Sequence, residues 1–418
     1  MNWPAYAEYK TTGMRWLSEV PAEWSVEKFR YCFRESNEKN GVAPVGEMLS
    51  VSGYRGVEVK QYDDDNRRRT AEELEDYRVV RVGQLAVNTM WLNYAGLGVS
   101  EFEGHISPAY RSYWIAPDFN RRYVHYLMRS AAYVDGYTAL LTGVRPNSLQ
   151  MSRDDLMGFP VLRPSAADQV GIANFLDRET AKIDALIAKQ EQLIATLREE
   201  RTAEISRNAD MVGQRVSSLG LLLAGIKDGT HGTFARVDET AGLPLLGARN
   251  VMGGEVVLDG GESHIAPSDH DGIVANGFPR KNDVLLVIVG ATIGKTAVYK
   301  AEHAQAFQRS VAFLRPDATL DSTFLWYQIQ SSRFQDELRL RSKTSAQPGI
   351  YLGDVAAIPV YLPPLDEQRR IASFLAVRTA MIDELIEKST AMIETLREYR
   401  SALITDAVTG KIDVRGVA

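Results

Sequence analysis

The segment that most suggests bond chemistry is Gly290-Ala291-Thr292-Ile293-Gly294-Lys295-Thr296, which resembles a phosphate-binding loop. The full motif, G-x-x-x-x-G-K-[ST], also needs a glycine at the position of Val289. Its absence changes the loop that would wrap the phosphates, so we expect no nucleotide binding. A second glycine-rich segment, Gly96-Leu97-Gly98, lacks the third glycine of a dinucleotide fingerprint, because Glu101 occupies its place.

Other catalytic patterns are missing from the sequence. The six histidines are scattered, and with the single cysteine, Cys32, they form no zinc-binding pattern. No G-x-S-x-G nucleophile elbow occurs, nor a paired-proline methyltransferase motif. We therefore expect a chain that is not an enzyme and holds no metal or cofactor of its own, with Cys32 as a small buried hydrophobe.

Composition restricts the class of protein. The 418 residues carry 48 Lys and Arg against 54 Asp and Glu, a net charge of −6, which argues against a nucleic-acid binder coated in positive charge. The longest apolar run, residues 284–289, is far shorter than the roughly 20 residues of a membrane span. We see no signal peptide, and one cysteine fits a reducing compartment, so we expect a cytoplasmic protein.

Loops rich in polar and aromatic residues suit nucleic acid. Arg reads guanine and Asn or Gln reads adenine in the major groove. Each loop taken alone is also compatible with an ordinary solvated turn, but such loops recur in matching order in the two halves of the chain. The candidate DNA-binding residues are Arg67, Arg68, Arg69, Asn88, Trp91, Asn93, Tyr94, Arg111, Arg145 and Asn147 in the first half, and Lys227, Thr230, His231, Arg249, Asn250, Lys295, Arg309, Lys343, Thr344 and Gln347 in the second.

An internal repeat organises the chain. Residues 159–206 align with residues 358–405 without a gap, and 23 of the 48 positions are identical. The identical positions include Gln169 and Gln368, and such similarity over this length indicates duplication.

Each copy predicts one long amphipathic helix. Pro164 and the pair Pro363-Pro364 lie just upstream, where proline is tolerated, and apolar residues recur in steps of three and four. A helix of about 40 residues is roughly 60 Å long. Two such helices bury their stripes most economically against each other as a coiled-coil pair. The expected core residues are Ile172, Leu176, Ile183, Leu186, Leu193, Leu197, Ile371, Leu375, Ile382, Leu385, Met392 and Leu396.

The helices divide the chain into residues 1–157, 158–206, 207–358 and 359–418, each with a net charge of −1 or −2. In each globular segment, short β-branched runs precede a predicted helix, at Arg121–Tyr133 in the first and at Thr323–Leu340 in the second. We therefore predict an α+β fold with two diverged globular domains on a duplicated scaffold, which suggests one assembly role and two different recognition tasks.

The chain resembles the specificity subunits of type I restriction–modification systems. The resemblance is carried by Leu362-Pro363-Pro364-Leu365-Asp366-Glu367-Gln368, by Ile371-Ala372-Ser373-Phe374-Leu375 and by Ile382-Asp383-Glu384-Leu385-Ile386. The segments 9–17, 20–24 and 409–415 and the Gly290–Lys295 loop are also typical of that family. The first repeat departs from the pattern, with Ser165-Ala166-Ala167-Asp168-Gln169 where Pro-Leu-x-Glu-Gln is usual.

This resemblance implies two target-recognition domains, each reading one half of a split DNA site, held apart by an antiparallel pair of helices. It implies two modification subunits that carry S-adenosylmethionine and methylate adenine N6, and restriction subunits that use ATP and Mg. No cofactor is expected in this chain.

Two physical expectations and two rival interpretations accompany the resemblance. The helix pair would act as a ruler, so the gap in the DNA site should follow helix length, and unlike domains should read an asymmetric site. The first rival is a coiled-coil protein-interaction scaffold without DNA readout, and the second is a nucleotide-using enzyme built on Gly294-Lys295-Thr296. Salt-dependent DNA binding and an ATP-binding assay would discriminate among them.

Overall fold

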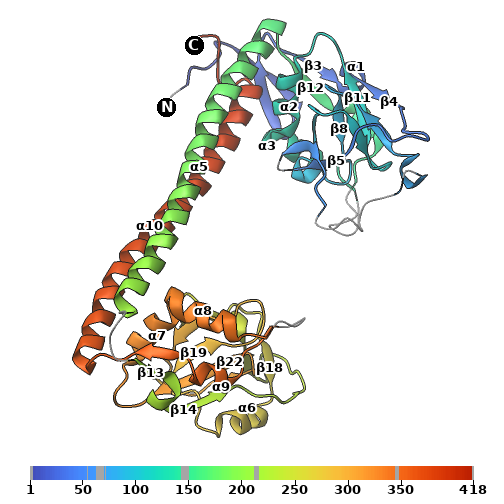
Figure 1. Cartoon of the computed structure of the whole chain (residues 1–418). Coiled ribbons are helices and arrows are strands. Elements are labelled where there is room, and N and C mark those ends of the chain that lie inside the picture. Colours follow the sequence, from blue (N-terminus) through green and yellow to red (C-terminus); the bar gives the residue numbers. More distant parts are fainter. Residues whose placement is uncertain are drawn as a thin grey trace. The chain divides into compact units, whose positions relative to one another are not determined.

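The computed structural model describes residues 3–53, 55–62, 70, 72–142, 150–210, 216–343 and 348–416. The chain forms two compact units (Figure 1). The first contains Met1–Gln190 and Ala391–Ala418, and the second is the continuous stretch Glu191–Thr390. Each unit thus combines one globular domain with the first part of one long helix and the last part of the other.

The first domain is built on two four-stranded sheets, with strand orders β6-β5-β10-β7 and β4-β11-β8-β9. Two two-stranded sheets, β1-β2 and β12-β3, complete it. Its strands are β1 (Tyr9–Met14), β2 (Leu17–Pro21), β3 (Ser25–Lys28), β4 (Phe33–Ser36), β5 (Glu47–Ser52), β6 (Gly56–Val59), β7 (Arg78–Val80), β8 (Leu85–Val87), β9 (Leu97–Val99), β10 (Gly104–Ile106), β11 (Arg111–Ile115) and β12 (Pro160–Arg163). Its helices are α1 (Phe29–Cys32), α2 (Arg121–Arg129), α3 (Ala131–Thr138) and α4 (Arg153–Gly158).

The second domain has a similar set of sheets, but its second-largest sheet has three strands instead of four. Its main sheet has the order β14-β22-β19-β20, beside a three-stranded sheet β18-β15-β21 and the pairs β13-β23 and β16-β17. The strands are β13 (Val216–Ser218), β14 (Leu223–Asp228), β15 (Leu243–Leu246), β16 (Val251–Met252), β17 (Glu255–Val256), β18 (Ser263–Ile265), β19 (Val284–Val287), β20 (Thr296–Val298), β21 (Ala306–Phe307), β22 (Val311–Pro316) and β23 (Pro359–Tyr361). The helices are α6 (Pro267–Val274), α7 (Ser322–Gln330), α8 (Ser332–Arg341) and α9 (Leu352–Ala356).

The single helix expected after the sheet in each domain is a pair of helices with a corner. Ser130 separates α2 from α3 with φ −64° and ψ 152°, and Ser331 separates α7 from α8 with φ −65° and ψ 150°. Each serine hydroxyl donates back to a carbonyl of the preceding helix. Extended backbone at one residue cannot continue a helix, so the chain turns at both serines.

The long helices α5 (Ala166–Ala209) and α10 (Leu365–Val408) have 44 residues each. Although the first repeat lacks the usual Pro-Leu pattern, α5 starts regularly, because the Ser165 hydroxyl accepts the Asp168 N–H at 3.1 Å. The two helices run antiparallel within each unit. In the first unit Arg400 Nε lies 2.8 Å from Asp184 Oδ1, and in the second Arg201 Nε lies 2.9 Å from Asp383 Oδ1. These ion pairs occupy equivalent positions of the repeat.

The helix seam is narrower than the sequence pattern predicts. The less exposed positions along the helix pair recur at steps of four, three, four, three and four residues, and those of α10 lie 199 residues after those of α5. They are Ile183, Ile187, Gln190, Ile194, Leu197 and Arg201 in α5, and Ile382, Ile386, Ser389, Ile393, Leu396 and Arg400 in α10. The expected core positions Leu186, Leu193, Leu385 and Met392 are wrong, because 43% to 50% of each side chain is exposed. A seam of two residues per heptad leaves no room for a third apolar position. Ile172, Leu176, Ile371 and Leu375 are buried against the globular domains instead.

A glutamine at the start of each long helix fastens it to its domain. Gln368 is buried; its Oε1 accepts the Asp321 N–H at 2.8 Å, and its Nε2 donates to Thr319 O at 2.8 Å and to Pro363 O at 2.9 Å. Gln169 makes the equivalent bonds to Asn120 N–H at 2.7 Å, Pro164 O at 3.1 Å and Asp118 O at 3.4 Å. Duplication has therefore preserved the helix together with its attachment.

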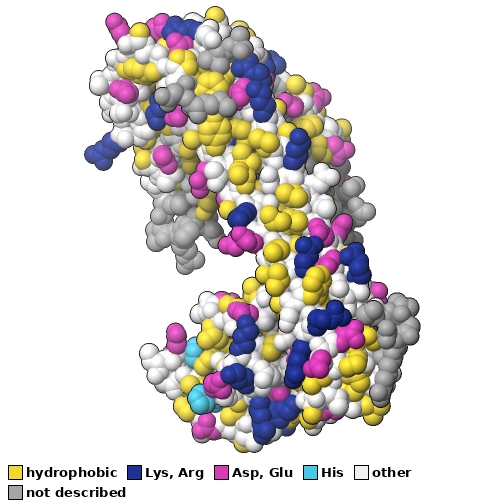
Figure 2. All heavy atoms as spheres, turned by 90° about the vertical axis from the view of Figure 1, so that its left-hand side faces the viewer, with side chains coloured by type: hydrophobic (Ala, Val, Ile, Leu, Met, Phe, Trp, Pro, Cys, Tyr) yellow, Lys and Arg dark blue, Asp and Glu magenta, His cyan; other side chains and the backbone are white. Residues whose placement is uncertain are grey.

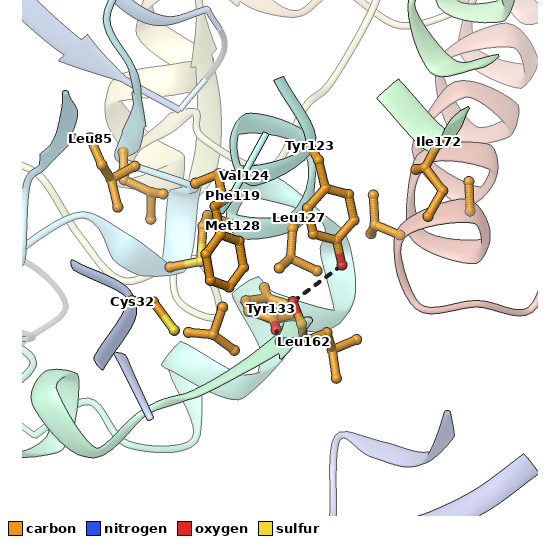
Figure 3. Close-up of a cluster of buried hydrophobic side chains, with 14 of the residues drawn as sticks. Cys32, Leu85, Phe119, Tyr123, Val124, Leu127, Met128, Tyr133, Leu162 and Ile172 are labelled. Atoms are coloured by element: carbon orange, nitrogen blue, oxygen red, sulfur yellow. Dashed lines mark hydrogen bonds between the residues drawn. The ribbon is translucent and has the colours of Figure 1, made fainter. Parts of the chain in front are cut away.

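The largest core cluster joins α2, α3, β12 and the start of α5 (Figure 3). The Leu162 N–H donates to the Tyr133 hydroxyl at 2.9 Å, and the Leu162 carbonyl accepts the Tyr123 hydroxyl at 3.4 Å. Cys32 lies in the same cluster, and burial raises the pKa of its thiol to about 12. None of the helices in the described part of the chain is long and apolar enough to cross a membrane.

Candidate nucleic-acid interface

The clearest candidate elements are two equivalent hairpin loops, one in each domain. Residues 88–96 join the antiparallel strands β8 and β9, and residues 288–295 join β19 and β20. The Asn88 N–H donates to Gly96 O, and the Val287 N–H donates to Lys295 O, both at 2.8 Å. Both loops contain residues predicted from the sequence to contact DNA.

The β8–β9 loop presents two aromatic rings to solvent. Trp91 is 54% and Tyr94 is 60% exposed, and their ring centroids lie 5.4 Å apart. Asn88 is buried, and its Oδ1 accepts the Met90 N–H at 3.2 Å, so this predicted reader shapes the loop from inside. Asn93, which lies between Trp91 and Tyr94 in the sequence, is partly exposed. The loop therefore offers stacking or apolar contact to bases, and little charge.

The β8–β9 loop is fixed from behind by the last residue of α2. Arg129 Nη1 donates to Ser52 O at 3.2 Å, to Ala95 O at 3.0 Å and to Leu97 O at 2.6 Å, and its Nη2 donates to Gly53 O at 2.9 Å. Burial lowers the pKa of Arg129 to about 10, which leaves it charged at neutral pH. One turn earlier, His125 Nδ1 accepts the Val99 N–H at 3.3 Å.

The β19–β20 loop has the glycines of a phosphate loop but a different setting. Gly290 and Gly294 have φ of 99° and 94°, which favours glycine. A phosphate loop connects a strand to a helix, whose N-terminal amides then face the anion, whereas this loop connects two antiparallel strands. Lys295 is exposed and lines a hollow of about 540 Å³ together with Arg201, Gln330 and Asp383. Arg201 is paired with Asp383, so Lys295 is the cation that this loop itself presents to solvent, which suits one backbone phosphate better than a nucleotide.

A third cluster, in the first domain, gathers three arginines around one carboxylate. Glu35 lies 3.4 Å from Arg111, 3.7 Å from Arg78 and 3.0 Å from Arg153. Burial and the neighbouring Arg111 charge lower the pKa of Arg78, as expected where guanidinium groups crowd together. Sequence reasoning found Arg111 alone, because β4, β7, β11 and α4 bring the other residues together from distant positions. The excess positive charge suits a phosphate.

In the second domain, several predicted residues are engaged internally. Arg249 binds Asp259 and donates to Gly261 O at 2.9 Å, and the buried Asn250 donates to Val257 O at 2.9 Å. His231 Nε2 lies 2.7 Å from Asp228 Oδ2. Lys343 lies over the Tyr351 ring at 4.3 Å.

The remaining predicted residues of the second domain lie beside one another. The Arg309 N–H donates to Thr230 O at 3.0 Å, which brings the exposed Arg309 next to the loop that follows Lys227. Seven candidates lie outside the described residues: Arg67, Arg68, Arg69, Arg145, Asn147, Thr344 and Gln347. Within the described ranges, no three His, Cys, Asp or Glu side chains gather as metal ligands would.

Residues 273–395 match the type I restriction modification DNA specificity domain. The chain is 23% identical over 316 residues to the type I restriction enzyme StySPI specificity subunit of Salmonella potsdam, a match covering 69% of this chain and 65% of that subunit. It is 23% identical over 323 residues to the EcoBI specificity subunit of Escherichia coli, covering 70% and 66%. The matches thus span just under two thirds of these relatives.

Solved structures share the fold. One, from a study of complex assembly and conformational transition of the type I R-M system, has a TM-score of 0.71 at 16% identity, covering 94% of this chain and 99% of that one. The HsdS subunit of Thermoanaerobacter tengcongensis has a TM-score of 0.51 at 16% identity, covering 94% and 98%. These comparisons confirm the resemblance found in the sequence: the chain is similar to type I restriction enzyme specificity subunits, and it shares the fold of solved structures from such systems.

Proposed function

We propose that this chain is the DNA-recognition subunit of a type I restriction–modification complex, and that it reads a bipartite, asymmetric site without catalysing a reaction. The observation that carries the proposal is the pair of equivalent hairpin loops on two similar domains. The framework of β8–β9 and α2 recurs as β19–β20 and α7, but the exposed side chains differ. Two similar frameworks with unlike loops are suited to two unlike half-sites.

The spacing between half-sites would follow from the long helices. Each has 44 residues and is therefore about 66 Å long. A helix is stiff over this length, especially when it pairs with another, so helix length should limit the gap that the two domains tolerate.

The modification subunits would dock on the helices. Apolar side chains remain exposed along α10, among them Phe374, Val377, Met381 and Leu385, and Figure 2 shows hydrophobic side chains at the surface along the helices. Exposed apolar patches of this kind are typical of protein interfaces. S-adenosylmethionine, ATP and Mg would be held by the modification and restriction subunits, and the complex would act in the cytoplasm.

Charge predicts how affinity is divided among the subunits. The chain carries a net charge of −6, so phosphate contacts are restricted to local clusters such as that of Arg78, Arg111 and Arg153 around Glu35. We expect the isolated chain to bind DNA weakly and the complex with the modification subunit to bind tightly.

A mobility-shift assay with and without the modification subunit, across a salt series, tests the proposal, because phosphate contacts weaken as salt rises. Sequencing of methylated adenines then gives the site. A two-part motif with unlike halves is the expected result. Absence of any salt-sensitive DNA binding in the assembled complex would favour the protein-interaction scaffold instead.

A further inference from the structure

In each recognition domain, one long polar side chain from the helical corner holds the hairpin loop. In the first domain this side chain is Arg129, which ends α2. In the second it is Gln335, in the first turns of α8. The two residues are not equivalent. Arg129 directly precedes the corner Ser130, and the residue that directly precedes the corner Ser331 is Gln330. The same task is thus performed from different positions.

The Arg129 contacts fix two loops against each other. The guanidinium donates to two carbonyls at the β9 end of the aromatic loop, Ala95 and Leu97, and to Ser52 and Gly53 of the neighbouring turn. Gly53 packs so closely that a Cβ there would lie 1.8 Å from Tyr94 O. Ala95 has a φ of 53°, a backbone region in which an alanine is uncommon and must be held by its surroundings.

The helix that carries Arg129 is itself fastened to α5. Arg122 forms an ion pair with Asp177 and donates to Asn174 Oδ1 at 2.8 Å. The Tyr126 hydroxyl donates to Asp177 Oδ1 at 2.9 Å. One face of α2 therefore binds the long helix while Arg129 binds the loop, so the loop takes its position from the helix scaffold.

In the second domain, the Gln335 contacts hold the hairpin loop against the two helices of the corner. Its Nε2 donates to Gly294 O at 3.1 Å and to Ile329 O at 2.7 Å. Gly294 packs against this side chain, because a Cβ there would lie 2.2 Å from Gln335 Oε1. The neighbouring Trp326 Nε1 donates to Thr296 O at 3.3 Å, directly after the loop. The β19–β20 loop is therefore attached to the corner between α7 and α8.

We propose that Arg129 and Gln335 are positioning residues that set base discrimination, each for the half-site read by its own domain. The inference rests on the proposed function. Neither side chain touches DNA: each holds the backbone of the loop that does. A loop that is fixed before binding loses less conformational freedom on binding and cannot adapt to a wrong base.

The loops offer different chemistry, so the consequences of release differ. Trp91 and Tyr94 would meet base edges or thymine methyl groups, and Lys295 would meet a phosphate. Loss of the Arg129 contacts should relax base preference in one half-site. Loss of the Gln335 contacts should relax the other half-site and, because it weakens the contact of Lys295 with phosphate, should also lower the salt dependence of binding.

The experiment compares R129M and Q335L in the full chain, produced together with its modification subunit. Sequencing of N6-methyladenine in genomic DNA gives the preference at every position of both half-sites. We expect discrimination to fall about tenfold or more in one half-site per variant, the scale of one good base contact, and to stay within about twofold in the other. K39Q, which breaks the exposed Lys39–Asp76 ion pair in the same domain as Arg129, should change neither.

A second measurement is independent of DNA. Hydrogen exchange of the segment 88–99 should accelerate in R129M, and that of the segment 288–296 in Q335L, with R129K intermediate between R129M and the unchanged chain. If R129M folds poorly, W91A removes a loop contact but leaves the Arg129 bonds in place, and it must relax the same half-site as R129K.

The outcomes separate the two proposals. Faster exchange with unchanged half-site preference would refute the positioning role and leave the proposed function standing. Both variants relaxing the same half-site, or both half-sites equally, would also refute it. No methylation motif for the unchanged chain would refute the proposed function, while exchange would still decide whether Arg129 and Gln335 hold the loops.

Discussion

Replacing Gln368 with leucine should destabilise the second unit substantially. The change removes three hydrogen bonds at a buried position and leaves the Asp321 N–H and the Thr319 and Pro363 carbonyls without this partner. Each buried polar group left unpaired costs about 1–3 kcal/mol. Because leucine fills most of the same volume and some groups can relax, we expect a loss of about 3–5 kcal/mol in the free energy of unfolding.

Gln169→Leu provides the matched variant in the first unit. One of its three bonds is long, at 3.4 Å, so the loss there should be smaller, about 2–4 kcal/mol. The two glutamines share no partner, so the double variant should lose the sum of the two effects.

Urea unfolding followed by peptide-resolved hydrogen exchange reads the two units separately. In Q368L, exchange should accelerate around Asp321 and the start of α10, while the peptides of the first unit stay protected. A change below about 0.5 kcal/mol in Q368L, the range of an ordinary surface substitution, would refute the reasoning. Equal loosening of both units by one variant would refute the local character of the attachment.

The other predictions concern the helices, a thiol, a histidine and an ion pair. Inserting four residues after Lys189, together with four after the equivalent Lys388, should lengthen the gap of the methylated site and keep both half-sites. The insertions fall at the boundary between the two units, and coiled coils absorb four extra residues by local unwinding. Methylome sequencing measures the gap. Native Cys32 should not react with a thiol reagent at pH 8, because burial raises its pKa to about 12 and keeps it neutral, whereas it should react after unfolding. Burial lowers the pKa of His125 to about 4, below its usual 6.5, so on acidification the unfolded chain binds the proton before the folded chain does. The free energy of unfolding should therefore fall by about 3 kcal/mol as the pH drops from 6.5 to 4. Urea unfolding at a series of pH values measures this fall, and H125F should lose it. R315M leaves the buried Asp283 without the guanidinium that it binds at 2.8 Å through both oxygens, which should cost about 3–5 kcal/mol in the same assay.

The scaffold was predictable from the sequence because duplication marks it twice. The same helical pattern occurs twice, 199 residues apart, and this predicted both helices. The structure shows the same equivalence, because the ion pairs Arg201–Asp383 and Arg400–Asp184 join matching positions of the repeat. The error at Leu186 and Leu193 came from reading every apolar residue at helical spacing as core. A two-helix seam accepts fewer positions than a helix packed on a globular domain, and spacing alone does not distinguish them.

The candidate site was less predictable, because its organisation depends on long-range contacts. Asn88 and Asn250 have the residue type of a base reader, but both are buried and shape their own loops. Arg129 looks like an ordinary arginine at a helix end, and its carbonyl partners lie more than 30 residues away. Only the alignment of the two hairpins, visible once the strands are placed, shows that Trp91 and Lys295 belong to equivalent loops.

The discontinuity of the first unit has a consequence for biosynthesis. Its core includes Leu403 and Val408 near the C-terminal end, and the Asp413 N–H donates to Pro4 O at 2.7 Å. Domains fold as they emerge from the ribosome, usually in sequence order. Here the second unit, residues 191–390, is translated completely before residues 391–418, which complete the first unit with the end of α10 and the segment that follows it. The first domain to be translated should therefore be the last to mature, and it should depend on the chaperones that protect an unfinished core while the rest of the chain is made.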